Sequence, residues 1–302
     1  MATRTPTSGT DATGDSAKDR VAGKVKSYAA VGVPSERWLP PPTLLTQIRA
    51  NMGLLQITFV NILVFLLIWE GVASLGVIPE IFFPAPSQIA AEFWSMVSDG
   101  TIAHHGLYSL INLTIGYTIA CVLGITTGLA MGTMKWLNTL LSPYYWTLNS
   151  MPDLAILPLI IMWFGFGMES KVLLIVLAAT IKIMITTLAG VGTVDPVLIR
   201  VAKIMGASPL QRYRKIVLPS TLPFILSGMK LGLSSALTAT VVSEMIGSAR
   251  GLGYVIIRQT EVFNPAGVFA ILGILAAVAL AMVNTMQWLQ YRVTPWARNV
   301  QV

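Results

Sequence analysis

The sequence predicts an all-α integral membrane protein, and three observations lead to this class. The chain of 302 residues is 54% apolar and 11% charged, with a mean hydropathy of +0.71, whereas a soluble domain is typically about 25% charged. Six apolar segments occur, each about twenty residues long, the length that a helix needs to cross a hydrocarbon core of roughly 30 Å. None alternates with the two-residue period of barrel strands, and only helices or closed barrels satisfy their backbone groups in lipid. The segments are residues 55–78, 107–131, 140–163, 172–190, 222–247 and 266–290.

The chain outside these segments is divided by composition. Residues 1–54 are rich in Thr, Ser, Pro and charge, which predicts a largely disordered tail with a short interfacial helix over Leu44–Met52. A transmembrane domain is expected over 55–291, interrupted by a polar insert at 191–221, and a second tail over 292–302. The single cysteine excludes an intramolecular disulfide.

The placement of basic residues predicts the orientation in the membrane. With the N-terminus inside, the tails and the insert hold most of the lysines and arginines, and the outer segments hold only Lys171, Arg250 and Arg258. Such an excess marks the cytoplasmic side, so both termini and the 191–221 insert are expected in the cytoplasm. Although the formal charge is +7, basic residues at membrane edges are not a nucleic-acid-binding stripe. No nucleic-acid partner is expected.

The insert contains residues that typically begin and end helices, and their positions predict two short helices. Asp195-Pro196 and Ser208-Pro209 each place an N-cap acceptor before proline at the first helical position. Gly206 suits the left-handed conformation that ends a helix, and Pro219 is expected to close the segment. A helix–turn–helix that is joined to membrane helices at both ends can move as a rigid unit and so transmit motion to those helices. An ordinary cytoplasmic loop is the alternative.

Two ionisable residues fall within the third and fourth apolar segments, where an unpaired charge is costly. Asp153 and Lys182 are expected at similar depth in an antiparallel hairpin that turns at Gly165–Gly167. We predict that they pair, which would offset the desolvation of each. The pair could lock the hairpin, or Lys182 could supply positive charge to an anion in transit.

The fifth segment is the predicted lining of a translocation pathway. It carries many small and hydroxylated residues, among them Ser235 and Thr238, which permit close helix contact and a hydrated path. Glu244, beside the glycine-rich turn Gly247–Gly253, is the predicted gate residue, because glycines can bend where other residues cannot. Glu70 in the first segment is expected to reach the membrane interface.

Two further patterns are interpreted as structural. Gly124, Gly128 and Gly132 recur at four-residue spacing, which is typical of a helix-packing face. His104-His105 has no carboxylate or thiol set nearby, so no metal site is expected there.

The insert resembles the cytoplasmic signature of permease subunits of bacterial binding-protein-dependent ABC importers, written EAA, three residues, G, nine residues, I-x-L-P. Ala202, Gly206, Ile216, Leu218 and Pro219 match at the family spacing. Arg200 and Val201 stand where the pattern has Glu and Ala.

Flanking motifs resemble one subfamily, the nitrate/sulfonate/taurine/bicarbonate-type importers, and most of all their taurine and aliphatic sulfonate permeases. The resemblance covers about residues 60–296. Its motifs are Phe83–Ser87, Leu157–Leu159, Trp163–Gly167, Ser243–Gly247, Arg250–Tyr254 and Thr294–Trp296.

The resemblance implies the type I permease fold, with six transmembrane helices and a cytoplasmic coupling-helix insert. It also implies a homodimer in the bacterial inner membrane that binds two ATP-binding cassette subunits and receives a small anion from a periplasmic or lipid-anchored solute-binding protein. The coupling residues it indicates are Ala202, Gly206, Ala207, Ser208, Leu210, Ile216, Leu218 and Pro219.

The chain has no G-x-x-x-x-G-K-[ST] phosphate loop, so we expect it to be a transporter subunit rather than an enzyme. It would hold no cofactor of its own, and ATP would be bound by the partner. An ion-gradient-driven secondary transporter is the alternative, although no inverted repeat was found. A membrane-embedded enzyme is disfavoured because Asp153, Lys182 and Glu244 are scattered over different helices.

Overall fold

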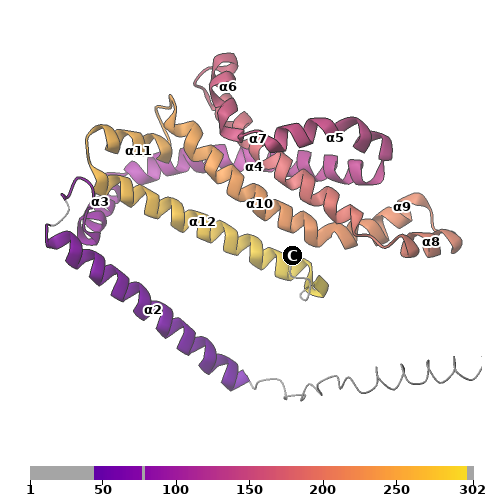
Figure 1. Ribbon diagram of the computed structural model, residues 1–302, viewed down its shortest axis with the longest axis horizontal. Helices are drawn as coiled ribbons and strands as arrows, with labels where there is room; N and C mark the ends of the chain where they lie inside the picture. The colour runs from indigo at the N-terminus through magenta and orange to yellow at the C-terminus, as the bar shows by residue number, and fades with distance from the viewer. Residues whose placement is uncertain (1–43, 77–78, 298–302) are drawn as a thin grey trace, which may run out of the picture. The chain divides into compact units, whose positions relative to one another are not determined.

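The computed structural model describes residues 44–76 and 79–297, and all regular structure in these ranges is helical (Figure 1). Side chains are described for residues 56–76 and 79–296. The chain divides into two units, residues 1–64 and 65–302. Most of the predicted tail lies outside the described residues. Helix α2 (Leu44–Ser74) begins at Leu44, so the predicted short helix and the first apolar segment form one continuous helix.

Among the residues that the structure describes, five stretches are long and apolar enough to cross a membrane, or six if one bent pair of helices counts as a single span. Those five fall on the first, second, fourth, fifth and sixth apolar segments. They are Gln56–Ser74 within α2, α4 (Thr101–Thr133), α7 (Met168–Gly192), Pro209–Met245 ending with α10 (Leu218–Met245), and α12 (Pro265–Val293).

The third apolar segment is broken and does not form a straight span. Helix α5 (Lys135–Ser150) is followed by the short η1 (Asp153–Ile156) and by α6 (Leu157–Phe164), with a bend of 94°. Met151 is extended at the break, with φ −81° and ψ 145°. A residue before proline is disfavoured in the helical region, so Pro152 accounts for the break. Asp153 therefore lies just after a bend rather than deep inside a helix.

Helix α7 lies at the centre of the core, packed against both α4 and α10. Glycines of α4 make this close packing possible. A side chain at Gly124 would meet Ile183 at 2.8 Å, and one at Gly128 would meet Thr187 at 2.8 Å. Gly132 lies likewise against Val191. The predicted packing face of α4 is confirmed, and its partner is α7.

Two amphipathic helices that the sequence analysis did not predict lie beside the spans. They are α3 (Pro86–Ser98) and α11 (Leu252–Glu261). Ser87 donates to the Glu70 carboxylate through its backbone N–H at 3.0 Å and its hydroxyl at 2.7 Å. Glu70 thus holds the N-terminus of α3, where a negative charge is favourable. Asn264 links the start of α12 to α3 by donating to Glu92 at 2.9 Å.

The start of α4 is shaped by a short polar turn. Gly100 has φ +79°, a left-handed conformation that glycine adopts without strain. The Thr101 backbone N–H donates to Asp99 Oδ1 at 2.8 Å. This hydrogen bond holds the pKa of the Asp99 carboxyl below its usual range, because it favours the charged form.

Candidate translocation site and coupling surface

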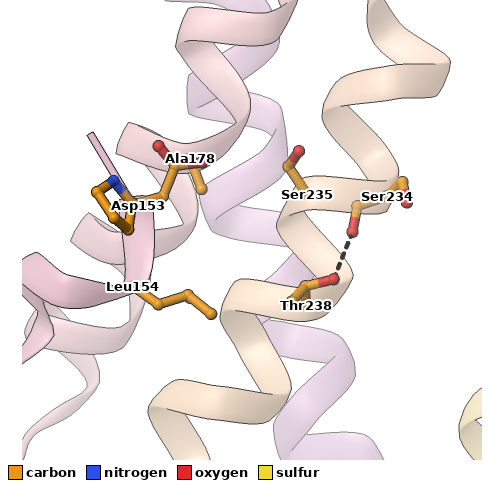
Figure 2. A pocket seen from close by; sticks show the side chains of 7 residues that line it. Asp153, Leu154, Ala178, Ser234, Ser235 and Thr238 are labelled. Carbon is orange, nitrogen blue, oxygen red and sulfur yellow. Dashed lines mark hydrogen bonds between the residues drawn. The ribbon is translucent and has the colours of Figure 1, made fainter. Parts of the chain in front are cut away.

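A pocket of about 330 Å³ lies between the bend after α5 and the middle of α10. It is lined by Pro152, Asp153, Leu154, Ala178, Ser234, Ser235 and Thr238. Figure 2 shows the residues of the bend on one side and those of α10 on the other. The Thr238 hydroxyl donates to the Ser234 carbonyl at 3.2 Å. Within the described residues the Ser234 and Ser235 hydroxyls have no hydrogen-bond partner, so they are available to a ligand.

The structure contradicts the predicted direct pair of Asp153 and Lys182. The Lys182 ammonium donates to Asn149 Oδ1 at 3.1 Å, and within the described residues it forms no salt bridge with Asp153. The two charges still interact electrostatically. The bend at Met151–Pro152 is the reason, because it removes Asp153 from the straight helix on which the pairing argument depended. Asn149, on the last turn of α5, accepts the hydrogen bond of the lysine instead.

Glu244 has no solvent exposure and lies in a polar cluster at the far end of α10. Its Oε2 accepts hydrogen bonds from the Ser109 hydroxyl at 2.8 Å and the Gly253 backbone N–H at 3.1 Å. Ser109 in turn accepts from the Leu252 backbone N–H at 2.9 Å. One carboxylate therefore ties α4, α10 and the start of α11 together.

The turn that follows α10 is fitted around this carboxylate. Gly251 has φ +110°, and a side chain there would collide with the Glu244 carboxyl group. A side chain at Gly253 would also meet Glu244, at 2.9 Å. Lys171 supplies a nearby counter-charge and is buried, donating to the Phe166 carbonyl at 3.0 Å. In this structure Glu244 is enclosed and holds the turn in place through its hydrogen bonds, and its role as a gate stays a prediction.

The insert contains the two predicted short helices, α8 (Pro196–Ile204) and α9 (Pro209–Arg212). The Val197 N–H donates to Asp195 at 2.7 Å, and the Gln211 N–H donates to Ser208 at 3.3 Å. Gly206 has φ +80°, and Ala207 N–H donates to the Ala202 carbonyl at 2.9 Å. This hydrogen bond is that of a Schellman C-cap. The matching Ala and Gly positions thus form one helix-ending unit.

The prediction that Pro219 closes the insert is wrong. Residues Tyr213–Val217 form a π-helical turn, in which the Leu218 N–H donates to the Tyr213 carbonyl, and α10 continues through Pro219. Proline has no N–H, and a π-turn is one way in which a helix absorbs such an interruption. Ile216, Leu218 and Pro219 are partly buried at this joint. The insert is thereby joined to α10 without a loop.

The tip of the insert is apolar and exposed. Ile204 is 86% exposed, Met205 81% and Leu210 63%. They surround the Gly206–Ser208 turn, while Arg200 and Lys203 are exposed on α8. An apolar tip flanked by basic side chains is suited to docking against another macromolecule.

The pocket brings together three of the five predicted pathway residues, Asp153, Ser235 and Thr238, and leaves out Lys182 and Glu244. The sequence analysis missed Asn149 and Ser109. Asn149 stands four residues before Asp153, but the break at Met151–Pro152 separates them, so helical spacing did not indicate that Asn149 would contact Lys182. No signal marked Ser109, which is 135 residues from Glu244.

Two further polar residues, His105 and Asn112, lie near Glu244 or the turn after α10. His105 accepts from the Gly251 N–H at 3.1 Å and so supports the turn after α10. Asn112 is fully buried beside Glu244. Neither its amide nitrogen nor its oxygen has a hydrogen-bond partner within the described residues.

Comparison with known proteins agrees with this architecture. The family described as binding-protein-dependent transport system inner membrane component matches residues 120–298. The taurine transport system permease protein TauC of Escherichia coli (strain K12) is 35% identical over 243 residues, covering 79% of this chain and 88% of that protein. The putative aliphatic sulfonates transport permease protein SsuC of Bacillus subtilis (strain 168) is 32% identical over 238 residues, covering 79% and 86%.

Solved structures share the fold. A crystal structure of an amino acid ABC transporter with histidines matches with a TM-score of 0.53 and 22% identity, covering 69% of this chain and 98% of that one. This chain therefore belongs to the inner membrane permease components of binding-protein-dependent ABC importers, and it is similar to permeases named for taurine and aliphatic sulfonates.

Proposed function

We propose that this permease carries a small sulfonate-like anion across the inner membrane through the pocket between the bend and α10. The observation that carries the proposal is the lining of that pocket, where the Ser234 and Ser235 hydroxyls, which have no partner within the described residues, face a break in a membrane segment. Hydroxyls donate to anionic oxygens, and a broken helix at membrane depth is tolerated where it lines a cavity. The similarity to taurine and sulfonate permeases supports this class of cargo over nitrate or bicarbonate.

We propose further that the insert is the docking surface for an ATP-binding cassette subunit. The exposed tip residues Ile204, Met205 and Leu210 would enter an apolar groove of that partner. The Schellman cap at Ala202–Ala207 would present them rigidly. Motion of the partner would reach the pocket through the π-turn and α10, since the insert and α10 are continuous.

The proposed assembly contains two copies of this chain, two ATPase subunits and a solute-binding protein. Both termini and the insert would face the cytoplasm, as the distribution of Lys and Arg indicates. The ATPase partner would supply all nucleotide binding.

The proposed function is tested by measuring the coupling between the permease and ATP hydrolysis, not by identifying the transported molecule. The transporter is purified with its ATPase subunit, and stimulation of ATP hydrolysis by loaded binding protein is measured for wild type, Gly206→Val and Gly192→Val. Neither glycine has atoms within 4 Å of an added side chain, and of the two only Gly206 has a positive φ. The left-handed conformation disfavours valine, so Gly206→Val should abolish stimulation while Gly192→Val retains it.

Failure to bring down an ATP-hydrolysing subunit would favour a secondary transporter and reject the proposed function. Normal stimulation in Gly206→Val would reject the docking role of the insert. Yield of monodisperse permease serves as the folding control for both variants.

A further inference from the structure

We propose that Lys230 of α10, together with Lys182 of α7, forms a binding site for an oxyanion on the insert side of the pocket. The two lysines lie one helical turn beyond residues that line the pocket, so this site is separate from the pocket itself. The inference rests on the proposed function, because it requires that an anion leave the pocket toward the insert. It assigns the route of the anion and the residues that receive it, whatever the identity of the cargo.

Lys230 lies inside a membrane-spanning helix without a partner. It follows Leu218, the first residue of α10, by twelve positions, so about 18 Å of helix separates it from that end at roughly 1.5 Å per residue. It is partly buried and has no hydrogen bond or salt bridge within the described residues. An unpaired charge in a span is costly unless water or a counter-ion reaches it. The face of α10 that carries Lys230 therefore borders a hydrated path.

Lys230 continues the row of polar residues of α10 that lines the pocket. It precedes Ser234 by four residues and Thr238 by eight, and both of these residues line the pocket (Figure 2). Residues four apart lie on one face of a helix. Ser234 and Thr238 are exposed in this chain, so neighbouring helices do not cover the row. Lys230 therefore lies at the insert end of the pocket.

Packing contacts between α7 and α10 place Lys182 and Lys230 at the same depth. A side chain at Gly228 would meet the Ile183 Cα atom at 3.4 Å, and one at Gly232 would meet the Ile183 side chain at 2.6 Å. Lys230 lies midway between these two glycines, and Lys182 is the neighbour of Ile183. The two lysines therefore occupy one level of two helices that pack directly together.

Lys182 reaches this level from the α7 side of the pocket. It follows Ala178, which lines the pocket, by four residues, so the two share a face of α7. Its ammonium carries three N–H groups, and one of them is directed to Asn149 at 3.1 Å. The other two N–H groups remain available to a ligand.

The balance of charge at this level favours an anion. Asp153 interacts electrostatically with Lys182, whereas Lys230 has no compensating partner in the described part of the chain. One positive charge is therefore in excess. An oxyanion offers several acceptor oxygens, so it can bind ammonium groups from two helices at once. Hydrogen bonds between ionised groups are roughly twice as strong as neutral ones, which would draw the anion from the pocket hydroxyls to the lysines.

The first arm of the test measures the electrostatic effect of Lys230 on the pocket. Ser234→Cys serves as a reporter in the complete transporter in lipid nanodiscs, in a Cys121→Ser background that removes the native thiol. Its modification rates with anionic and cationic methanethiosulfonates of equal chain length are measured by mass spectrometry of the permease. Lys230→Gln should lower the anion-to-cation rate ratio about tenfold, whereas Lys230→Arg should keep it.

Lys135→Gln is the matched control, because it removes one positive charge from an exposed lysine at the start of α5. It should leave the rate ratio unchanged. Thr238→Cys is a second reporter and Lys230→Asn a second neutral variant, for use if the first of either kind does not assemble. An unchanged ratio in Lys230→Gln overturns the inference, since the lysine would then extend to the membrane interface instead of the path. Absence of reaction at both reporters, or failure of both neutral variants to assemble, also overturns it.

The second arm tests binding of an anion at the lysines. Ethanesulfonate and ethanesulfonamide share a skeleton, but only the first is charged. Ethanesulfonate should slow modification of the reporter by an uncharged methanethiosulfonate several-fold, and ethanesulfonamide should not. Lys230→Gln should abolish this protection, whereas Lys230→Arg should keep it. Equal protection of Lys230→Gln and wild type would mean that the anion binds without the lysine, and would overturn the inference.

The proposed function is judged separately, by assembly with the ATPase subunit and by stimulated ATP hydrolysis. A transporter that couples normally but does not respond to Lys230→Gln in either arm rejects the oxyanion site alone. A permease that assembles with no ATPase subunit rejects the proposed function, and the oxyanion site fails with it.

Discussion

Two carboxylates in the membrane domain, Glu244 and Asp153, have opposite surroundings. Glu244 is fully buried, accepts from two donors, and is covered by glycines that leave no room for a side chain. Asp153 lies after a helix break, on the wall of an open pocket. An acidic residue in a membrane segment thus stabilises the packing of helices where several donors bind it. Where a pocket lies beside it, the same residue is a candidate for binding a transported molecule. Burial and free volume distinguish the two roles.

The largest effect is expected from removing the buried carboxylate. Glu244→Ala leaves the Ser109 hydroxyl and the Gly253 N–H without their acceptor. Breaking a buried charged network costs about 3–5 kcal/mol of folding free energy, so yield and thermal stability in detergent should fall sharply. Asp153→Ala should change stability by less than about 1 kcal/mol, since Asp153 forms no salt bridge or hydrogen bond in the described part of the chain. Equal losses in both variants would contradict the comparison.

The glycine fit around Glu244 can be tested without touching the carboxylate. Gly251→Ala combines a left-handed backbone with a collision against Glu244, and we expect a loss of about 2–4 kcal/mol in stability. Gly100→Ala has φ +79° but open space around the new methyl group, so it should lose only about 1–2 kcal/mol. Thermal unfolding of the two variants is the measurement. If the two variants unfold at the same temperature, the packing of the turn around Glu244 is not tight.

Serines at the two sites should respond differently to the same change. Ser109→Ala removes a donor to Glu244 and leaves the Leu252 N–H unpaired, which should cost about 1–2 kcal/mol. Ser234→Ala removes a hydroxyl without a partner in the described structure and should leave stability within about 0.5 kcal/mol. Transport should show the reverse order, with the larger relative loss per folded molecule in Ser234→Ala. A stability loss in Ser234→Ala would indicate that the pocket hydroxyl is structural.

The smallest effect concerns the partner of Lys182. A double-mutant cycle of Lys182→Met with Asn149→Leu should give a coupling of about 1 kcal/mol, because the two side chains share a hydrogen bond. The cycle of Lys182→Met with Asp153→Asn should give less than about 0.5 kcal/mol, as expected for charges that are not in direct contact. Stability in detergent is again measured. The opposite ranking would restore the direct ion pair predicted from the sequence.

Prediction from sequence was most successful where a property is local. Helix length in lipid depends on a run of apolar residues, and the caps at Asp195, Gly206 and Ser208 depend on single residues with known backbone preferences. The failures arose where several residues act together. Met151–Pro152 breaks the third segment, and this one bend invalidated the depth argument for Asp153 and Lys182.

The sequence by itself determined the membrane class, the family resemblance and the two short helices of the insert, since each follows from composition, spacing or the chemistry of one residue. Only the tertiary structure decided which acidic residue fastens the fold and which faces a pocket. Glu244 and Asp153 are both carboxylates near helix ends. The role of Glu244 depends on Ser109 and Gly253, and that of Asp153 depends on Ser234. Ser109 lies far from Glu244 in the chain, and Ser234 lies far from Asp153. Contacts between such distant residues follow from helix packing, which no local pattern specifies.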